Sequence, residues 1–136
     1  MLAVKVALGL GGLFFLTGLL SGIWKYYHMS TSEDGEAPTY VNIAHRAALL
    51  YSFACGLLAA LIYFSVFSTT VNLIALVSMV VFFASAVIRY IQLGITGETD
   101  NQYRDEGVLL TVGMVLLILG EVGGFVVIFT GFLLSF

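Results

Sequence analysis

VNLIALVSMVVFFASAVIRYIQL, residues 71–93, is the segment of this chain most indicative of its fold. It contains one charged side chain, Arg89, and it is longer than the roughly 20 apolar residues that a helix needs to cross about 30 Å of hydrocarbon. Three more apolar runs occupy residues 2–24, 47–67 and 108–136. The runs are continuous rather than alternating with period 2, which excludes a β-barrel. We therefore predict an all-α fold, a four-helix transmembrane bundle with antiparallel up-down topology.

The composition indicates the same class of protein. Of the 136 residues, 60% are hydrophobic and 10% are charged, whereas a soluble domain carries about 25% charged residues. The net charge of −3 argues against nucleic acid as a partner. Four helices and two loops use up the whole length, so we predict a single integral membrane domain over residues 1–136.

The polar stretches between the runs set the expected boundaries. We expect helices at about residues 2–27, 43–67, 71–95 and 108–135, with loops at about 28–42 and 96–107. An even number of spans places both termini on one side of the bilayer and both acidic loops on the other. More Lys and Arg flank the loop side than the terminal side, so the loops are expected in the cytoplasm of a multi-pass protein of a bacterial inner membrane.

Two Gly-x-x-x-Gly pairs, Gly18 with Gly22 and Gly120 with Gly124, offer faces on which helices can approach closely. Packing within the chain is the commoner use of such a face, and a subunit interface is the alternative. Because four helices cannot bury every small-residue stripe inside one bundle, we predict an oligomer whose contact uses one of these two faces.

His45 stands at the entrance of the second helix and is the first candidate for chemistry. At coiled-coil spacing it is followed only by small residues, namely Ala48, Ser52, Cys55 and Ala59. A histidine above such a face suits a flat macrocycle, since an imidazole nitrogen can bind iron and the small side chains leave room for the ring. Helix packing explains the stripe equally well. If a cofactor binds, His45 is its metal ligand, and Arg46 and Ser52 belong to the cofactor site.

Arg89 and Glu121 lie inside apolar runs. Arg89 must face protein or water, or reach out to the headgroups, and it is a further candidate for cofactor binding. Glu121 stands about a dozen residues into the last run, among glycines. A lone carboxylate is strongly disfavoured there, so Glu121 is either uncharged or paired, with Arg89 as the natural partner. Its possible roles are a catalytic proton relay, a carboxylate beside a cofactor, or an interhelical clasp.

With these residues in place, the chain resembles the styrene oxide isomerase family over residues 18–132. The landmarks are Ala44-His45 after the long first loop, Val87-Ile88-Arg89-Tyr90 near the end of the third helix, and the polar loop 97–101 before a glycine-rich last helix. That family consists of small four-helix membrane proteins, known as trimers that hold haem b on a histidine. The resemblance implies haem b on His45, Tyr90 as the catalytic phenol, and a homo-oligomer such as a trimer.

Two positions depart from the family pattern. Arg46 follows the histidine where the family has a small residue, and Tyr51 stands near the position of the active-site asparagine. The resemblance therefore supports the architecture and the haem, but it does not carry the isomerase reaction.

We predict a small polytopic membrane protein that binds haem b through His45 and performs electron transfer or ferric Lewis-acid chemistry of the epoxide isomerase kind. The alternative is a non-catalytic accessory subunit or assembly factor of a larger membrane complex. A third hypothesis is a proton-coupled transporter that uses Glu121 and Arg89.

Overall fold

The computed structural model describes residues 1–104 and 107–136, so Asp105 and Glu106 of the second acidic loop lie outside the described residues. The chain forms four helices, α1 (Leu2–Thr31), α2 (Thr39–Phe64), α3 (Thr69–Thr96) and α4 (Val108–Leu133). Each of them is long and apolar enough to cross a membrane. The predicted all-helical four-helix fold is confirmed, and the described part of the chain contains no strand.

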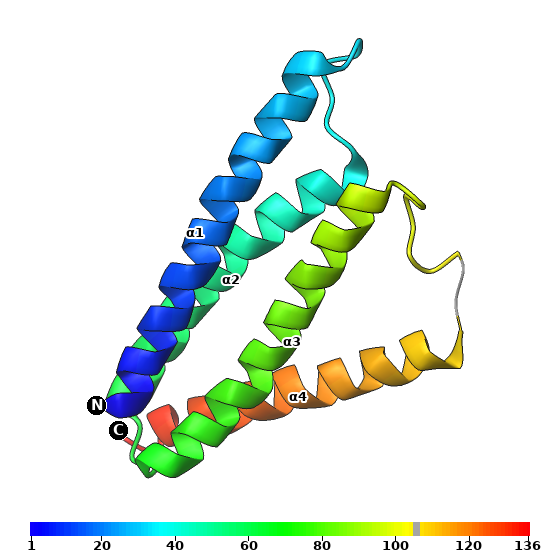
Figure 1. Cartoon of the computed structure of the whole chain (residues 1–136). Coiled ribbons are helices and arrows are strands. Elements are labelled where there is room, and N and C mark those ends of the chain that lie inside the picture. Colours follow the sequence, from blue (N-terminus) through cyan, green and yellow to red (C-terminus); the bar gives the residue numbers. More distant parts are fainter. Residues whose placement is uncertain (105–106) are drawn as a thin grey trace.

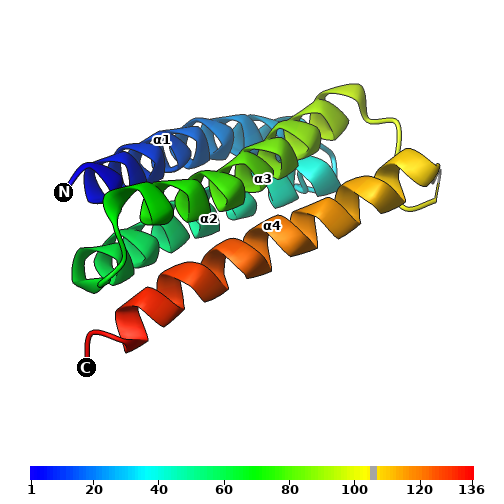
Figure 2. The same cartoon turned by 90° about the horizontal axis from the view of Figure 1, so that it is seen from below.

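The two termini lie at one end of the bundle, and the two longer loops lie at the other (Figures 1 and 2). This arrangement suits a multi-pass membrane protein. The alternating direction in which the helices cross a bilayer, the side that carries the loops and the bacterial inner membrane stay predictions.

Three helix ends lie three or more residues from the predicted boundaries. The reason is that hydropathy indicates the length of an apolar run, whereas hydrogen bonding sets where a helix begins and ends. The helix α1 continues to Thr31, where the hydroxyls of Ser30 and Thr31 each donate to the carbonyl of Tyr27 at 2.9 Å. The helix α2 begins directly after Pro38, whose missing N–H costs nothing at a helix start. It ends at Phe64, ahead of the short turn to α3.

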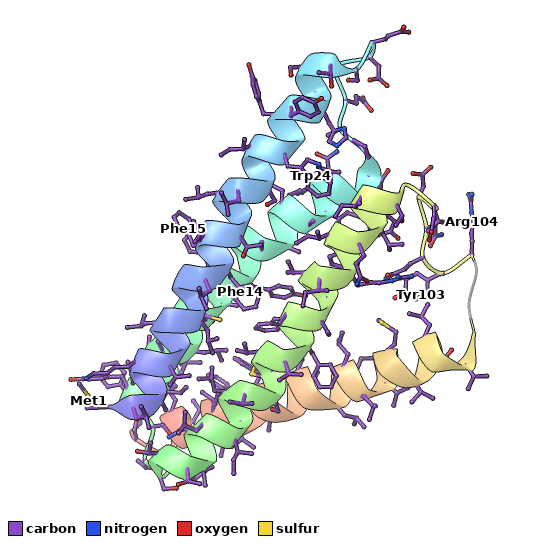
Figure 3. All side chains as sticks on the ribbon, viewed as in Figure 1. Met1, Phe14, Phe15, Trp24, Tyr103 and Arg104 are labelled. Atoms are coloured by element: carbon purple, nitrogen blue, oxygen red, sulfur yellow. The ribbon has the colours of Figure 1, made fainter. Side chains whose placement is uncertain are left out.

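The helices α1 and α2 share the most extensive contact of the bundle. Small side chains of α2, among them Ala48 and Cys55, are fully buried there. Phe14 of α1 is 8% exposed and points between α1 and α3, whereas the next residue, Phe15, is 44% exposed and points outward (Figure 3). Phe14 meets Phe83 of α3 edge to face, with ring centroids 6.5 Å apart. Tyr51 of α2 lies against both rings, with its centroid 6.0 Å from that of Phe14 and 4.2 Å from that of Phe83, so the three rings join α1, α2 and α3 in one packed unit.

The fourth helix is attached differently. It contacts α3 and α2, and among the described residues it has no contact with α1. Only a small share of α4 is buried within the chain, and Ile128, near its carboxyl end, is fully buried. Figure 1 shows α4 diverging from α3 toward the loop end of the bundle. The fold is therefore a packed three-helix unit with a fourth helix anchored mainly at one end.

Both Gly-x-x-x-Gly faces pack inside the chain. A Cβ added to Gly18, Gly22, Gly120 or Gly124 would run into Leu49, His45, Phe82 and Ala75, respectively. Packing within the chain, the commoner use of such faces, is therefore observed at both, and the predicted subunit contact through one of them stays a prediction. The oligomer itself stays a prediction.

Candidate functional site

The structure separates the sequence-predicted site residues into two groups. His45, Arg46 and Ser52 lie on α2, and His45 and Ser52 face α1. Arg89 and Tyr90 lie on α3, in the wall of a cavity that α3 forms with α4. Glu121 belongs to α4, near the inner end of that cavity. No single site unites the two groups.

His45 is held against α1 by a hydrogen bond to a backbone carbonyl. Its Nδ1 lies 2.8 Å from the carbonyl oxygen of Gly18, which also accepts from the Ser21 hydroxyl at 3.0 Å. A carbonyl oxygen cannot donate, so Nδ1 must carry the proton and donate. In the neutral ring, Nε2 then keeps the lone pair that a metal would use.

The small-residue stripe below His45 is filled by α1. Ala48, Ser52, Cys55 and Ala59 are all buried. A Cβ on Gly11 of α1 would lie 3.1 Å from Cβ of Cys55 and 3.2 Å from the carbonyl oxygen of Ser52. The helices therefore touch backbone to backbone, and a macrocycle does not fit along this stripe. Arg46 is exposed on the other side of α2.

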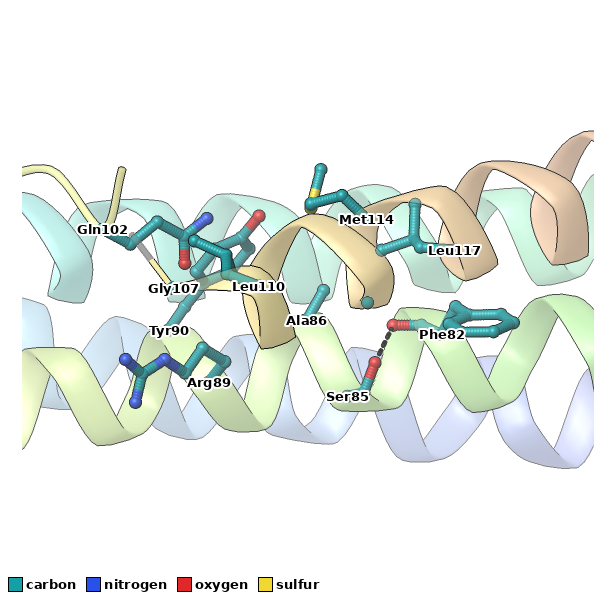
Figure 4. Close-up of a pocket in the computed structure, with 11 residues that line it drawn as sticks. Phe82, Ser85, Ala86, Arg89, Tyr90, Gln102, Gly107, Leu110, Met114 and Leu117 are labelled. Carbon is teal, nitrogen blue, oxygen red and sulfur yellow. Dashed lines mark hydrogen bonds between the residues drawn. The ribbon is translucent and has the colours of Figure 1, made fainter. Parts of the chain in front are cut away.

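A cavity of about 570 Å³ lies between α3 and α4. Its polar end is lined by Arg89, Tyr90 and Gln102, and its apolar end by Phe82, Met114 and Leu117 (Figure 4). This volume falls within the roughly 300–1,000 Å³ of small-molecule sites in proteins. The cavity is thus amphipathic, with one cationic side chain at its polar end.

The cavity exists because two glycines bring α4 close to α3 at only one end. At Gly124 an added Cβ would lie 2.6 Å from the carbonyl oxygen of Ala75, and at Gly120 the carbonyl accepts from the Ser78 hydroxyl at 3.3 Å. At Gly113, nearer the loop, an added Cβ would meet nothing within 4 Å. The helices touch at Gly120 and Gly124 and part toward the loop.

A hydrogen bond to Tyr40 of α2 holds the second loop at the rim of the cavity. The backbone N–H of Gln102 donates to the hydroxyl of Tyr40 on α2 at 2.7 Å. The Tyr40 ring stacks on Tyr90, with centroids 6.0 Å apart. Sequence reasoning missed both Tyr40 and Gln102, because nothing in the sequence indicates a contact between residues so far apart along the chain.

Arg89 and Glu121 do not form the predicted clasp. Arg89 is exposed in the cavity wall, and among the described residues no carboxylate forms an ion pair with it. Glu121 Oε1 is buried and has no hydrogen-bond partner. Within the described chain, Arg89 and Glu121 are therefore not paired with each other.

The first loop carries its own charge cluster, away from this cavity. The backbone N–H of Glu36 donates to Asp34 Oδ1 at 3.0 Å. This bond, with a further contribution from the Ser32 side chain, lowers the pKa of the Asp34 carboxyl. Asp34 is thus a fixed negative charge on the loop end at neutral pH.

Among the described residues, no group of three His, Cys, Asp or Glu side chains gathers as a metal site requires.

Comparisons with protein families, with curated proteins and with solved structures give no match to this chain. The resemblance to the styrene oxide isomerases therefore stays a prediction, and the amphipathic cavity between α3 and α4 is the site that the geometry alone supports best.

Proposed function

We propose that this protein binds an anionic amphiphile, a molecule with a carboxylate or phosphate head and an apolar chain, in the cavity between α3 and α4. The observation that carries the proposal is Arg89, a cation in the wall of an otherwise mostly apolar cavity. Arg89 precedes the end of α3 by seven residues, which places it roughly 10 Å inside the helix at 1.5 Å per residue. An arginine at membrane depth is a candidate functional residue by default.

The two ends of the cavity match the two ends of such a ligand. A guanidinium donates two parallel hydrogen bonds to a carboxylate or a phosphate, and the Tyr90 hydroxyl and Gln102 amide at the same end can donate further ones. Phe82, Met114 and Leu117 give the apolar chain a surface free of charge. The bound anion would offset the cost of holding Arg89 below the headgroups.

The test is a titration of purified protein in neutral detergent with a fluorescent fatty acid, cis-parinaric acid. Arg89→Gln removes the charge and is expected to weaken binding at least tenfold, since a hydrogen bond to a charged group is worth about 1.5–3 kcal/mol. Lys25→Gln is the control, because it removes a cation from α1 that does not line the cavity.

A second pair of variants tests the location. Gly113→Leu fills the cavity without meeting a neighbour at its Cβ, and it is expected to abolish binding. Gly12→Leu makes the same change on α1, where a Cβ also meets nothing within 4 Å, and should bind normally. Equal binding by Arg89→Gln and the native protein, or equal affinity for the acid and its methyl ester, rejects the proposal.

Haem binding is the second candidate, and one contact favours it. The bond from His45 Nδ1 to Gly18 fixes the tautomer that leaves Nε2 free for a metal. The available space argues against haem, because α1 covers the small-residue stripe of α2 beneath the His45 ring. If haem binds, adding hemin gives a Soret band that His45→Ala abolishes and His28→Ala keeps. Absence of the band in the native protein rejects haem.

A further inference from the structure

Amphiphile binding leaves the half-buried Glu121 of α4 without a role. It lies thirteen residues after the first residue of α4 and twelve before the last, close to the middle of the helix. At that depth its side chain is about as far from either membrane surface as the helix allows. Its Oε1 is enclosed by protein and has no hydrogen-bond partner.

The position of Glu121 is set by its glycine neighbours. Gly120, on one side, packs against Phe82, and Gly124, one turn further, packs against the backbone of Ala75. These two contacts fix the rotation of α4 on α3. Glu121 therefore cannot turn away from the bundle without breaking both of them.

The contacts that flank Glu121 are with neutral groups of α3. Phe82 lies against Gly120, and the Ser78 hydroxyl donates to the Gly120 carbonyl at 3.3 Å. Arg89 on α3 forms no ion pair with it. An ionised carboxylate here would have no compensating cation, and burying such a charge is strongly unfavourable. The carboxyl group is therefore expected to hold a proton.

The cavity between α3 and α4 supplies a path for that proton. Its inner end is lined by Leu117, one helical turn before Glu121 on the same face of α4. The loop end of the cavity is lined by Gln102 and Gly107, at the end of the bundle that carries the loops (Figure 4).

We propose that Glu121 is a reversible proton-binding site in the middle of the bilayer, which exchanges its proton with the loop side through the α3–α4 cavity. A hydronium ion in the cavity gives its proton to the ionised Glu121 carboxylate and is left as water. The reverse step returns the proton to the loop side. This proposal does not rest on amphiphile binding.

The first test uses the reactivity of a protonated carboxyl group. Dicyclohexylcarbodiimide, which dissolves in lipid, takes the acid proton on its nitrogen while the carboxylate adds to its central carbon, so the whole reagent is added and nothing leaves. We expect one adduct on Glu121 by peptide mass spectrometry and none there in Glu121→Gln. A water-soluble carbodiimide should modify loop acids such as Glu33 and spare Glu121. Modification of Glu121 by the water-soluble reagent at the rate of Glu33 overturns the proposal.

The second test follows the path. Infrared spectroscopy in D₂O reports the exchange of a protonated carboxyl group through the shift of its C=O band, which Glu121→Gln should remove. Gly113→Leu places a side chain in the cavity and is expected to slow exchange at least tenfold. Gly12→Leu, on α1, should exchange at the native rate.

The outcomes separate this proposal from amphiphile binding. Native exchange in Gly113→Leu, or a protonated band that persists in Glu121→Gln, overturns the proton site. Arg89→Gln should lose amphiphile binding and keep the Glu121 band, so failure of one proposal leaves the other measurable.

Discussion

The α1–α2 contact and the α3–α4 contact are built from the same kind of residue and have opposite outcomes. Along α1, Gly11, Gly18 and Gly22 all lie against α2, so the two helices touch over most of their length. Along α4, Gly120 and Gly124 touch α3, while Gly113 faces open space. Small residues thus close one interface completely and the other only in part.

This difference decides where a ligand can bind. The stripe below His45 looks suited to a cofactor when α2 is considered alone, but in the bundle it is the surface on which α1 packs. Arg89 of α3 lies in the cavity wall, where α4 leaves it uncovered. A small-residue stripe is therefore informative about a site only once its partner helix is known.

The largest loss of stability is expected from disrupting the α1–α2 interface. Gly11→Leu forces a side chain into the backbone contact with Ser52 and should lower the free energy of unfolding by about 3 kcal/mol, the upper range for overpacked sites. Denaturation by sodium dodecyl sulfate in mixed micelles measures it. Gly12→Leu, one residue on, faces open space and should be near neutral. Equal losses in the two variants would contradict the close approach of α1 and α2.

A smaller effect is expected at the closed end of the α3–α4 contact. Gly124→Ala places a Cβ 2.6 Å from the carbonyl oxygen of Ala75, so α4 must shift, at a cost of about 1–2 kcal/mol. Gly123→Ala is the matched control, since its Cβ would meet nothing within 4 Å. The same unfolding assay measures both. Loss of stability in Gly123→Ala but not in Gly124→Ala would mean that α4 is rotated from the orientation described.

The hydrogen bond between His45 and Gly18 should contribute about 1 kcal/mol. His45→Ala removes it, but the carbonyl of Gly18 keeps the hydroxyl of Ser21 as a donor at 3.0 Å, so the loss is expected to stay modest. Measuring unfolding without added hemin separates the contribution of this hydrogen bond to stability from any effect of a cofactor. A loss above 3 kcal/mol would show that His45 does more than hold α2 on α1.

The smallest loss of stability is expected at Tyr40, at the rim of the α3–α4 cavity. Tyr40→Phe keeps the ring that stacks on Tyr90 and removes the hydroxyl that accepts from the Gln102 N–H at 2.7 Å. Global stability should fall by about 0.5–1 kcal/mol, while hydrogen exchange at the Gln102 amide should speed up. Tyr63→Phe, far from this loop, should leave that amide unchanged. Unaltered exchange in Tyr40→Phe would show that the bond does not hold the loop.

The candidate site could be predicted in part. Arg89 and Glu121 are predictable from the sequence because a charge inside an apolar run is costly and therefore conspicuous. Tyr90 came only from the family resemblance. Of the two alternatives for Glu121, uncharged or paired with Arg89, the pairing is not observed, because depth along a helix does not say which way the side chain faces. Gln102 gave no signal, since an amide in a polar loop is ordinary.

The length and apolar composition of the four runs were enough to predict four helices that can cross a bilayer. A helix satisfies its own backbone hydrogen bonds, so length and apolar composition within each run are sufficient. Only the packing of the helices shows that α1 covers the small-residue stripe below His45 and that α4 leaves Arg89 exposed in the cavity wall. These outcomes depend on contacts between residues far apart in the chain, such as Gly18 with His45 and Gln102 with Tyr40, which no local pattern encodes.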